Sequence, residues 1–118
     1  AKGRTRVFGI GPAVDLTYPV EWLGDDAALV AALPEHVAAA LAGAERPAII
    51  VGMGALTVPG LYEAAAGLAK AANVVRDGWN GWNLLHTAAA RPGALALGLA
   101  VAGGLPALLA DDGIKALF

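Results

Sequence analysis

A continuous apolar run from Pro47 to Val51 leads directly into a glycine-rich turn, Gly52-Met53-Gly54. A short run of this kind, closed by glycines, is typical of a parallel strand that is buried on both faces. After a second turn at Pro59-Gly60, apolar residues recur at helical spacing over 61–72, and polar residues lie on the opposite side. The sequence therefore predicts one strand–loop–helix unit of a layered sheet.

The flanking segments continue the alternation between β-branched runs and runs rich in alanine and leucine, which is typical of the α/β class. The elements expected before the central unit are a strand over 6–11 that closes in a turn at Gly11-Pro12, a helix over 27–33 capped by Asp25 or Asp26, and a helix between Pro34 and Gly43. The elements expected after it are a strand over 74–78, a helix over 84–91 capped by Asn83 and stopped before Pro92, a helix over 105–109, and a strand over 114–118.

These elements predict a single Rossmann-like α/β domain over residues 1–118, with a mostly parallel sheet flanked by helices. The last predicted strand is cut by the end of the sequence, so we expect an excised fragment of a longer region. Apolar residues make up 58% of the chain, against about 45–50% in typical soluble domains. We therefore expect part of the surface to be covered by something else or to meet lipid.

The lipid alternative rests on residues 92–110, which carry no charge and approach the length of a bilayer crossing. Glycines and Pro106 divide this segment into short pieces, so a buried globular segment is favoured and no membrane span is predicted. A net charge of -2 leaves no basic stripe for a phosphate backbone, so nucleic acid is not an expected partner.

The sequence offers little for catalysis or metal binding. It contains no cysteine, which excludes disulfides, thiolate metal sites and cysteine-ligated iron–sulfur clusters within this chain. His36 and His86 are the only histidines, and neither has carboxylates at the spacing of a metal site or a catalytic triad. Asp15 and the Asp111-Asp112-Gly113 segment are expected to form turns. No catalytic residue and no metal ligand is predicted.

Two segments could contact a cofactor. Gly52 and Gly54 stand between a strand and a helix, where backbone N–H groups can hold a phosphate, but the rest of the dinucleotide fingerprint is missing and a plain turn is favoured. Trp79 and Trp82 could stack on a planar group, yet large anchors whose indole N–H groups find acceptors are the preferred interpretation. His86 is expected to be a polar neighbour of Asn80 or Asn83. The residues left as cofactor-binding candidates, although no site is expected, are Gly52, Gly54, Trp79, Asn80, Asn83 and His86.

Three ordered segments resemble one protein family. They are Gly9 to Tyr18 with Trp22-Leu23-Gly24-Asp25 after it, Arg46 to Gly52, and Trp82 to Gly98. Together they resemble the large iron–sulfur subunit of the respiratory NADH:quinone oxidoreductase, complex I. The sequence departs from the family pattern at Pro92, where an apolar residue is usual, and at Ala96, where an acid is usual.

The resemblance implies a piece of the C-terminal region of that subunit, which is similar to molybdopterin-dependent oxidoreductases. In complex I this region generally holds no molybdenum cofactor, and the 2Fe-2S and 4Fe-4S clusters belong to a cysteine-rich N-terminal part outside this chain. The implied role is a structural, cofactor-free part of an enzyme that carries electrons from NADH toward quinone, with no active site in this piece. The implied partners are the remainder of the subunit and other subunits of the peripheral arm, on the cytoplasmic side of a bacterial inner membrane or the mitochondrial matrix side.

Two alternatives stay open. A pterin or nucleotide site inherited from molybdoenzymes could survive around Gly52, Gly54, Asn80 and Asn83. Residues 44–52 also resemble the central domain of thiamine-diphosphate enzymes, where a similar strand and loop serve a flavin or a nucleotide, but that likeness covers only one strand and one helix.

Overall fold

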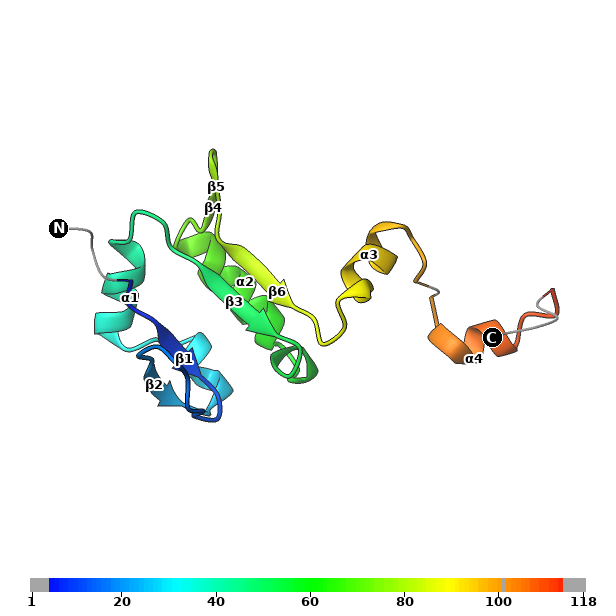
Figure 1. The fold of residues 1–118 in the computed structure, drawn as a ribbon, viewed down its shortest axis with the longest axis horizontal. Coiled ribbons are helices and arrows are strands. Elements are labelled where there is room, and N and C mark those ends of the chain that lie inside the picture. The colour runs from blue at the N-terminus through cyan, green and yellow to red at the C-terminus, as the bar shows by residue number, and fades with distance from the viewer. Residues whose placement is uncertain (1–4, 101, 114–118) are drawn as a thin grey trace. The chain divides into compact units, whose positions relative to one another are not determined.

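The computed structural model describes residues 5–100 and 102–113 (Figure 1). The chain divides into two compact units, Ala1–Leu85 and His86–Phe118. The strands of the first unit are β1 (Phe8–Ile10), β2 (Glu21–Gly24), β3 (Ile49–Gly52), β4 (Val75–Arg76), β5 (Trp79–Asn80) and β6 (Trp82–Leu85). Its helices are the 3₁₀ turn η1 (Ala27–Val30), α1 (Glu35–Ala42), the 3₁₀ turn η2 (Ala55–Thr57) and α2 (Leu61–Ala71). The second unit contains α3 (Ala90–Ala96) and α4 (Gly104–Leu109).

The described strands form three two-stranded sheets. Strands β1 and β2 pair in parallel, β3 and β6 pair in parallel, and β4 and β5 form an antiparallel hairpin. A mixed α/β chain with parallel pairing is therefore confirmed. The continuous Rossmann-like sheet over a single domain stays a prediction, because each sheet among the described residues has only two strands.

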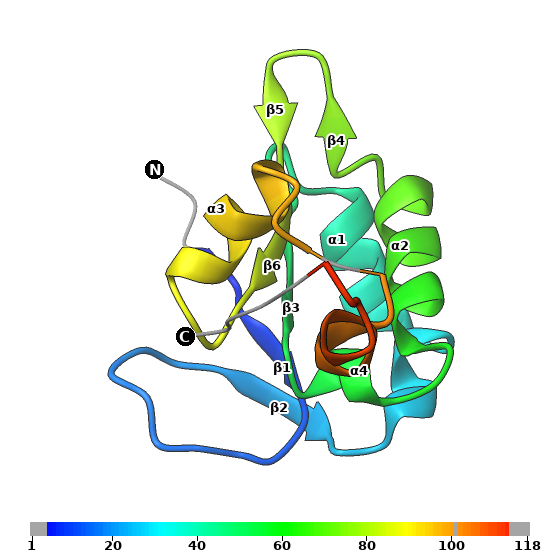
Figure 2. The same ribbon diagram turned by 90° about the vertical axis from the view of Figure 1, so that its right-hand side faces the viewer.

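The central unit of the fold is the β3–α2–β6 crossover. Helix α2 lies beside the β3–β6 pair in both ribbon views (Figure 2). The side of the sheet that faces α2 carries Ile49, Val51, Trp82 and Leu84. Val51 is buried there, as are Ala65 and Ala69 on α2, and the Tyr62 ring meets the Trp82 ring edge-on. The small side chains of Ala65 and Ala69 let the helix approach the sheet closely.

The predicted burial of the central strand on both faces is wrong. Ile50, on the face away from α2, is 61% exposed, and Leu85 on β6 is 59% exposed on the same face. Both strands alternate between less and more exposed residues, because the described residues of the first unit supply a helix layer on one side only.

The predicted helix over 84–91 is also wrong. Residues 82–85 are strand β6, which pairs in register with β3, and the helix begins later, at Ala90. Asn83 therefore lies within a strand and caps no helix. Pro92 does not stop a helix but occupies the first turn of α3, where its missing N–H would have no intrahelical partner.

The remaining helices and strands agree with the sequence predictions in some segments and differ in others. The strand over 6–11 is confirmed as β1, the helix ending at Gly43 as α1, and the helix over 105–109 as α4. The helix over 27–33 shrinks to the 3₁₀ turn η1, in which the Asp26 carboxylate accepts a 2.8 Å hydrogen bond from the Ala28 N–H. Strand β2 was not predicted, and the strand over 74–78 is one arm of the β4–β5 hairpin. The strand predicted over 114–118 lies outside the described residues. Of the helices in the described part of the chain, none is long and apolar enough to cross a bilayer.

Gly81 joins the hairpin to the β3–β6 sheet. This buried residue donates its N–H to the Val74 carbonyl at 2.8 Å, and its own carbonyl accepts from the Ile49 N–H at 2.8 Å. A Cβ atom added here would overlap the Pro47 carbonyl oxygen and lie 2.9 Å from Nε1 of Trp79. Only glycine permits this approach of the two backbones.

We therefore expect Gly81→Ala to destabilise the fold by about 1–3 kcal/mol through overpacking. Gly67→Ala is the matched control, because Gly67 lies within α2 with open space around the position of an added Cβ. Alanine there should stabilise the helix by about 0.5–1 kcal/mol. Urea unfolding followed by tryptophan fluorescence measures both changes. A G81A chain as stable as the parent would show that the close approach does not constrain the fold.

Candidate functional site

Trp79 acts as an anchor at the base of the hairpin. Its indole N–H donates to the Pro47 carbonyl at 2.8 Å, and the Arg46 guanidinium lies over its ring at 5.5 Å from the centroid. The polar atom of this side chain is thus engaged by the segment that leads into β3. The arrangement matches the anchoring interpretation that the sequence favoured for this residue.

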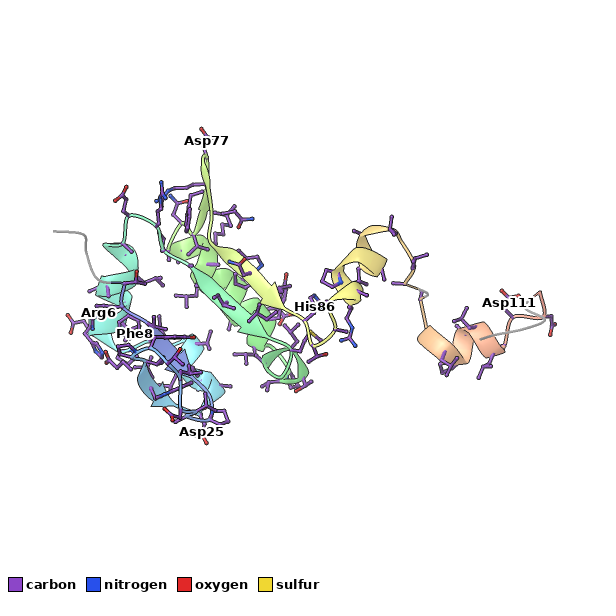
Figure 3. All side chains as sticks on the ribbon, viewed as in Figure 1. Arg6, Phe8, Asp25, Asp77, His86 and Asp111 are labelled. Atoms are coloured by element: carbon purple, nitrogen blue, oxygen red, sulfur yellow. The ribbon has the colours of Figure 1, made fainter. Side chains whose placement is uncertain are left out.

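Further bonds hold the hairpin. The Arg76 guanidinium donates to the Glu45 carbonyl and, at 3.3 Å, to the Asn73 carbonyl. The side-chain oxygen of Asn80 accepts from the Trp82 N–H at 3.0 Å. Asp77 lies at the hairpin tip, away from the rest of its unit (Figure 3). The candidate residue Asn80 therefore uses its acceptor to shape the link between β5 and β6.

The glycine turn after β3 forms a compact 3₁₀ structure. The N–H groups of Leu56 and Thr57 donate to the carbonyls of Met53 and Gly54, and the Thr57 hydroxyl also donates to the Gly54 carbonyl at 2.7 Å. The helical segment that follows, η2, has only three residues. A helix dipole develops over aligned peptide units, so this short turn offers little of the field that draws phosphate to longer helices.

Asn83 and His86 lie on either side of the end of β6. Asn83 is exposed on the sheet face away from α2. His86 is half-buried immediately after the strand, and its Nδ1 atom is buried without a hydrogen-bond partner.

The strand register spreads the candidates along the sheet. Ile49 stands opposite Trp82, so Trp79 and Asn80 precede the N-terminal end of the sheet. Asn83 lies within the sheet, opposite Ile50, and Gly52, Gly54 and His86 are at or beyond its C-terminal end. Four residues of parallel strand span roughly 13 Å. The structure therefore does not bring the six candidates together around one point.

A shallow cavity lies elsewhere in the first unit. Its volume is about 310 Å³, and it is lined by Ala66, Ala69, Lys70, Asn73, Val75 and Trp82. None of the six candidates contributes to this lining. No group of three or more metal-binding side chains occurs among the residues that the structure describes.

An ionic cluster that the sequence did not predict joins β1, β2 and α1. Glu21 on β2 lies 2.5 Å from Nε2 of His36 and 3.4 Å from the Arg6 guanidinium. The Arg6 guanidinium stacks 4.8 Å from the Phe8 ring centroid, and Figure 3 shows these two residues beside each other. The run Val20 to Leu23, between Pro19 and Gly24, was the available signal for the missed strand that carries Glu21.

The cluster stabilises the charged form of its carboxylate. The hydrogen bond from His36, with the charges of His36 and Arg6, holds the pKa of Glu21 below its ordinary value of 4.5, against an opposing effect of desolvation. Because the pKa of Glu21 is lower in the folded state, its ionised carboxylate stabilises the fold at pH values above the ordinary pKa of 4.5. This stabilisation is lost as the pH falls through the folded-state pKa.

We therefore expect Glu21→Gln to flatten the acid side of the stability curve, because the variant has no carboxylate to protonate. The measurement is the free energy of unfolding in urea from about pH 6 to about pH 3. Glu63→Gln, at an exposed position on α2, is the control and should keep the acid dependence of the parent chain. If the free energy of unfolding of E21Q fell with decreasing pH as steeply as that of the parent chain, Glu21 would not be the stabilising carboxylate.

Comparison with known proteins places the chain in a family. The molybdopterin oxidoreductase family model matches residues 1–118. The chain is 40% identical over 100 residues to the NADH dehydrogenase (ubiquinone) iron-sulfur protein 1, mitochondrial, of Solanum tuberosum, covering 80% of this chain and 14% of that protein. It is 33% identical over 104 residues to the NADH-ubiquinone oxidoreductase 75 kDa subunit of Reclinomonas americana, covering 83% of this chain and 15% of that protein.

A third relative aligns over nearly the whole chain. It is the NADH-ubiquinone oxidoreductase 78 kDa subunit, mitochondrial, of Candida albicans, 34% identical over 122 residues, covering 99% of this chain and 16% of that protein. The chain thus spans about one sixth or less of the length of these relatives. Their names confirm the resemblance to the large iron–sulfur subunit of NADH:quinone oxidoreductase. The chain belongs to the molybdopterin oxidoreductase family.

Proposed function

We propose that this chain is a structural part of the large subunit that carries electrons from NADH toward quinone, and that it supplies no redox group of its own. The relatives named as NADH-ubiquinone oxidoreductase subunits support the parent activity. The observation that carries the structural role is the use of the candidate polar groups by the fold itself. Trp79 bonds to Pro47, and Asn80 bonds to Trp82.

The family is named for molybdopterin, so the residues of this chain can be compared with what a molybdopterin site needs. A site for a large polar cofactor needs several polar groups that converge on an enclosed pocket. No polar or charged side chain among the described residues is fully buried, and the cavity of about 310 Å³ is shallow and mostly apolar in its lining residues. The described residues do not fit a molybdopterin, and we assign no step of the reaction to it here.

We propose that the iron–sulfur clusters of the parent subunit lie outside this chain. One relative is named an iron-sulfur protein, and cysteine thiolates are the usual cluster ligands. This chain has no cysteine. The 2Fe-2S and 4Fe-4S clusters of the parent subunit would accordingly be held by other parts of the longer protein, and this chain would contribute rigid packing to the subunit.

The surface of the chain supports a role within an assembly. Large apolar side chains are exposed in both units, including Tyr18 and Ile50 in the first and Leu97 and Leu109 in the second. We infer that some of these side chains contact other protein, because contiguous exposed apolar patches commonly mark such contacts. We propose the rest of the subunit and neighbouring peripheral-arm subunits as partners, on the cytoplasmic side of a bacterial inner membrane or on the mitochondrial matrix side.

The test separates assembly from chemistry. Gly81→Ala, introduced into the full-length subunit, should reduce the amount of assembled complex several-fold, because a loss of about 1–2 kcal/mol in stability changes abundance by about that factor. NADH:quinone turnover per assembled complex and the electron paramagnetic resonance signals of the clusters should not change. Gly67→Ala is the control for all three readouts and should lower none of them.

A different result would contradict the proposal. If G81A lowered turnover per assembled complex, or removed a cluster signal at normal abundance, this region would take part in electron transfer directly.

A further inference from the structure

Asn80 and Gly81 form a chemically labile pair at the end of β5. An asparagine that precedes glycine deamidates readily, because no side chain on the second residue hinders attack by its backbone nitrogen. A bulkier residue at position 81 would slow this reaction, but a Cβ there would overlap the Pro47 carbonyl oxygen. The fold therefore requires glycine at the position that makes Asn80 labile.

The fold also uses the Asn80 side chain. Its oxygen, Oδ1, accepts a 3.0 Å hydrogen bond from the N–H of Trp82, two residues along the chain. This bond forms an Asx turn that carries the backbone from β5 into β6. Asparagine or aspartate can supply such an acceptor, whereas an apolar side chain cannot. A labile pair is thus part of the link between the two strands.

The deamidation reaction needs only this chain and water. The Gly81 nitrogen loses its proton to a base and attacks Cγ of Asn80, so that a new N–Cγ bond closes a succinimide ring. The Cγ–Nδ2 bond breaks, and the Nδ2 group takes up a proton and leaves as ammonia. Water then opens the ring at either carbonyl and gives aspartate or isoaspartate. The net change is the uptake of water and the release of ammonia.

The folded hairpin holds both reacting groups away from this reaction. The Gly81 N–H donates to the Val74 carbonyl at 2.8 Å, so its proton is not available to a base while that bond is made. The Asn80 side chain is held by the Trp82 N–H, and its backbone is paired with Val75 across the hairpin. Backbone amides in such bonds give up their protons only when the structure opens locally. Attack by the Gly81 nitrogen therefore requires the base of the hairpin to open.

We propose that Asn80–Gly81 is a deamidation site that is protected in the folded chain and reacts when the base of the β4–β5 hairpin opens. The Trp79 indole N–H, which donates to the Pro47 carbonyl at 2.8 Å, is a contact that opposes this opening. The inference goes beyond the proposed function and does not rest on it, because it uses only bonds within the first unit.

Isoaspartate at position 80 would make the opening permanent. In isoaspartate the peptide bond to Gly81 runs through the side-chain carbons, which adds a carbon to the backbone between the two residues. Gly81 could then not bond to both Val74 and Ile49, because these two hydrogen bonds fix its position between them. A reversible local opening would become an irreversible loss of the start of β6.

The test compares deamidation in the folded and unfolded states. The full-length protein is incubated at the same mildly alkaline pH in native buffer and in guanidinium chloride. Trypsin cleaves after Arg76, and tandem mass spectrometry of the peptide that begins at Asp77 separates a mass shift at Asn80 from one at Asn83. A sample taken before incubation measures any deamidation during digestion.

We expect Asn80 to deamidate in guanidinium chloride and to do so at least about tenfold more slowly in native buffer. Asn83 is the internal control, because the bulky side chain of Leu84 follows it, and it should stay unmodified in both buffers. Equal rates at Asn80 in the two buffers would overturn the protection by the fold. An intact Asn80 in guanidinium chloride would overturn the site itself.

A pair of variants tests the role of the hairpin base. Trp79→Phe keeps an aromatic ring but removes the N–H that bonds to Pro47, and it should raise the native deamidation rate several-fold. Tyr62→Phe is the matched control, because it removes a hydroxyl from α2 and leaves the hairpin bonds unchanged. A native rate in W79F equal to that of the parent would overturn the proposal. If W79F does not fold, the comparison of the two buffers for the parent chain still decides.

Refolding tests the consequence of the modification. After the guanidinium chloride is removed, chains with isoaspartate at position 80 should be missing from the folded fraction. The Asn80→Asp chain, which keeps the normal backbone and an acceptor for the Trp82 N–H, should refold. Equal recovery of isoaspartate chains and unmodified chains in the folded fraction would show that the opening is not made permanent.

Discussion

The close approach of Gly81 to the segment at Pro47 is the constraint on which the rest of the first unit depends. At this point the Gly81 carbonyl accepts from Ile49, its N–H donates to Val74, and the Trp79 indole N–H reaches the Pro47 carbonyl. These bonds fix where β6 starts relative to β3, and the four-residue parallel register follows from that start. They also fix the base of the β4–β5 hairpin. A side chain at position 81 would force the two backbones apart.

Much of the central unit could be predicted from sequence, because its signals are local. The apolar run at β3 and the helical spacing of α2 are complete within their own segments. Strand β6 could not be predicted in the same way. Leu84 and Leu85 before an alanine-rich stretch favour a helix locally, and only the non-local pairing with β3 makes them a strand. The burial of Ile50 was misjudged for a related reason, since a strand's second layer comes from elsewhere in the structure.

The candidate site shows the same division between local and non-local information. The sequence singled out the glycines, tryptophans, asparagines and histidine as candidates and favoured an anchoring role over cofactor binding for Trp79. In the structure the indole N–H of Trp79 donates to the Pro47 carbonyl, as an anchor would. The sequence could not place the candidates at opposite ends of a sheet, because that placement depends on the β6 register. It also missed Glu21, whose partners His36 and Arg6 come from other elements. These residues serve the fold, which agrees with the structural role proposed for this chain.

The central claim is that this region carries no cofactor of its own, and release of small molecules tests it most directly. The purified chain, at known concentration, is denatured, and the supernatant is examined by mass spectrometry and absorbance. The account predicts no pterin, flavin or nucleotide at a ratio approaching one per chain. A stoichiometric pterin or nucleotide would contradict it and would make the turn at Gly52 and the loop at Trp79 parts of a ligand site.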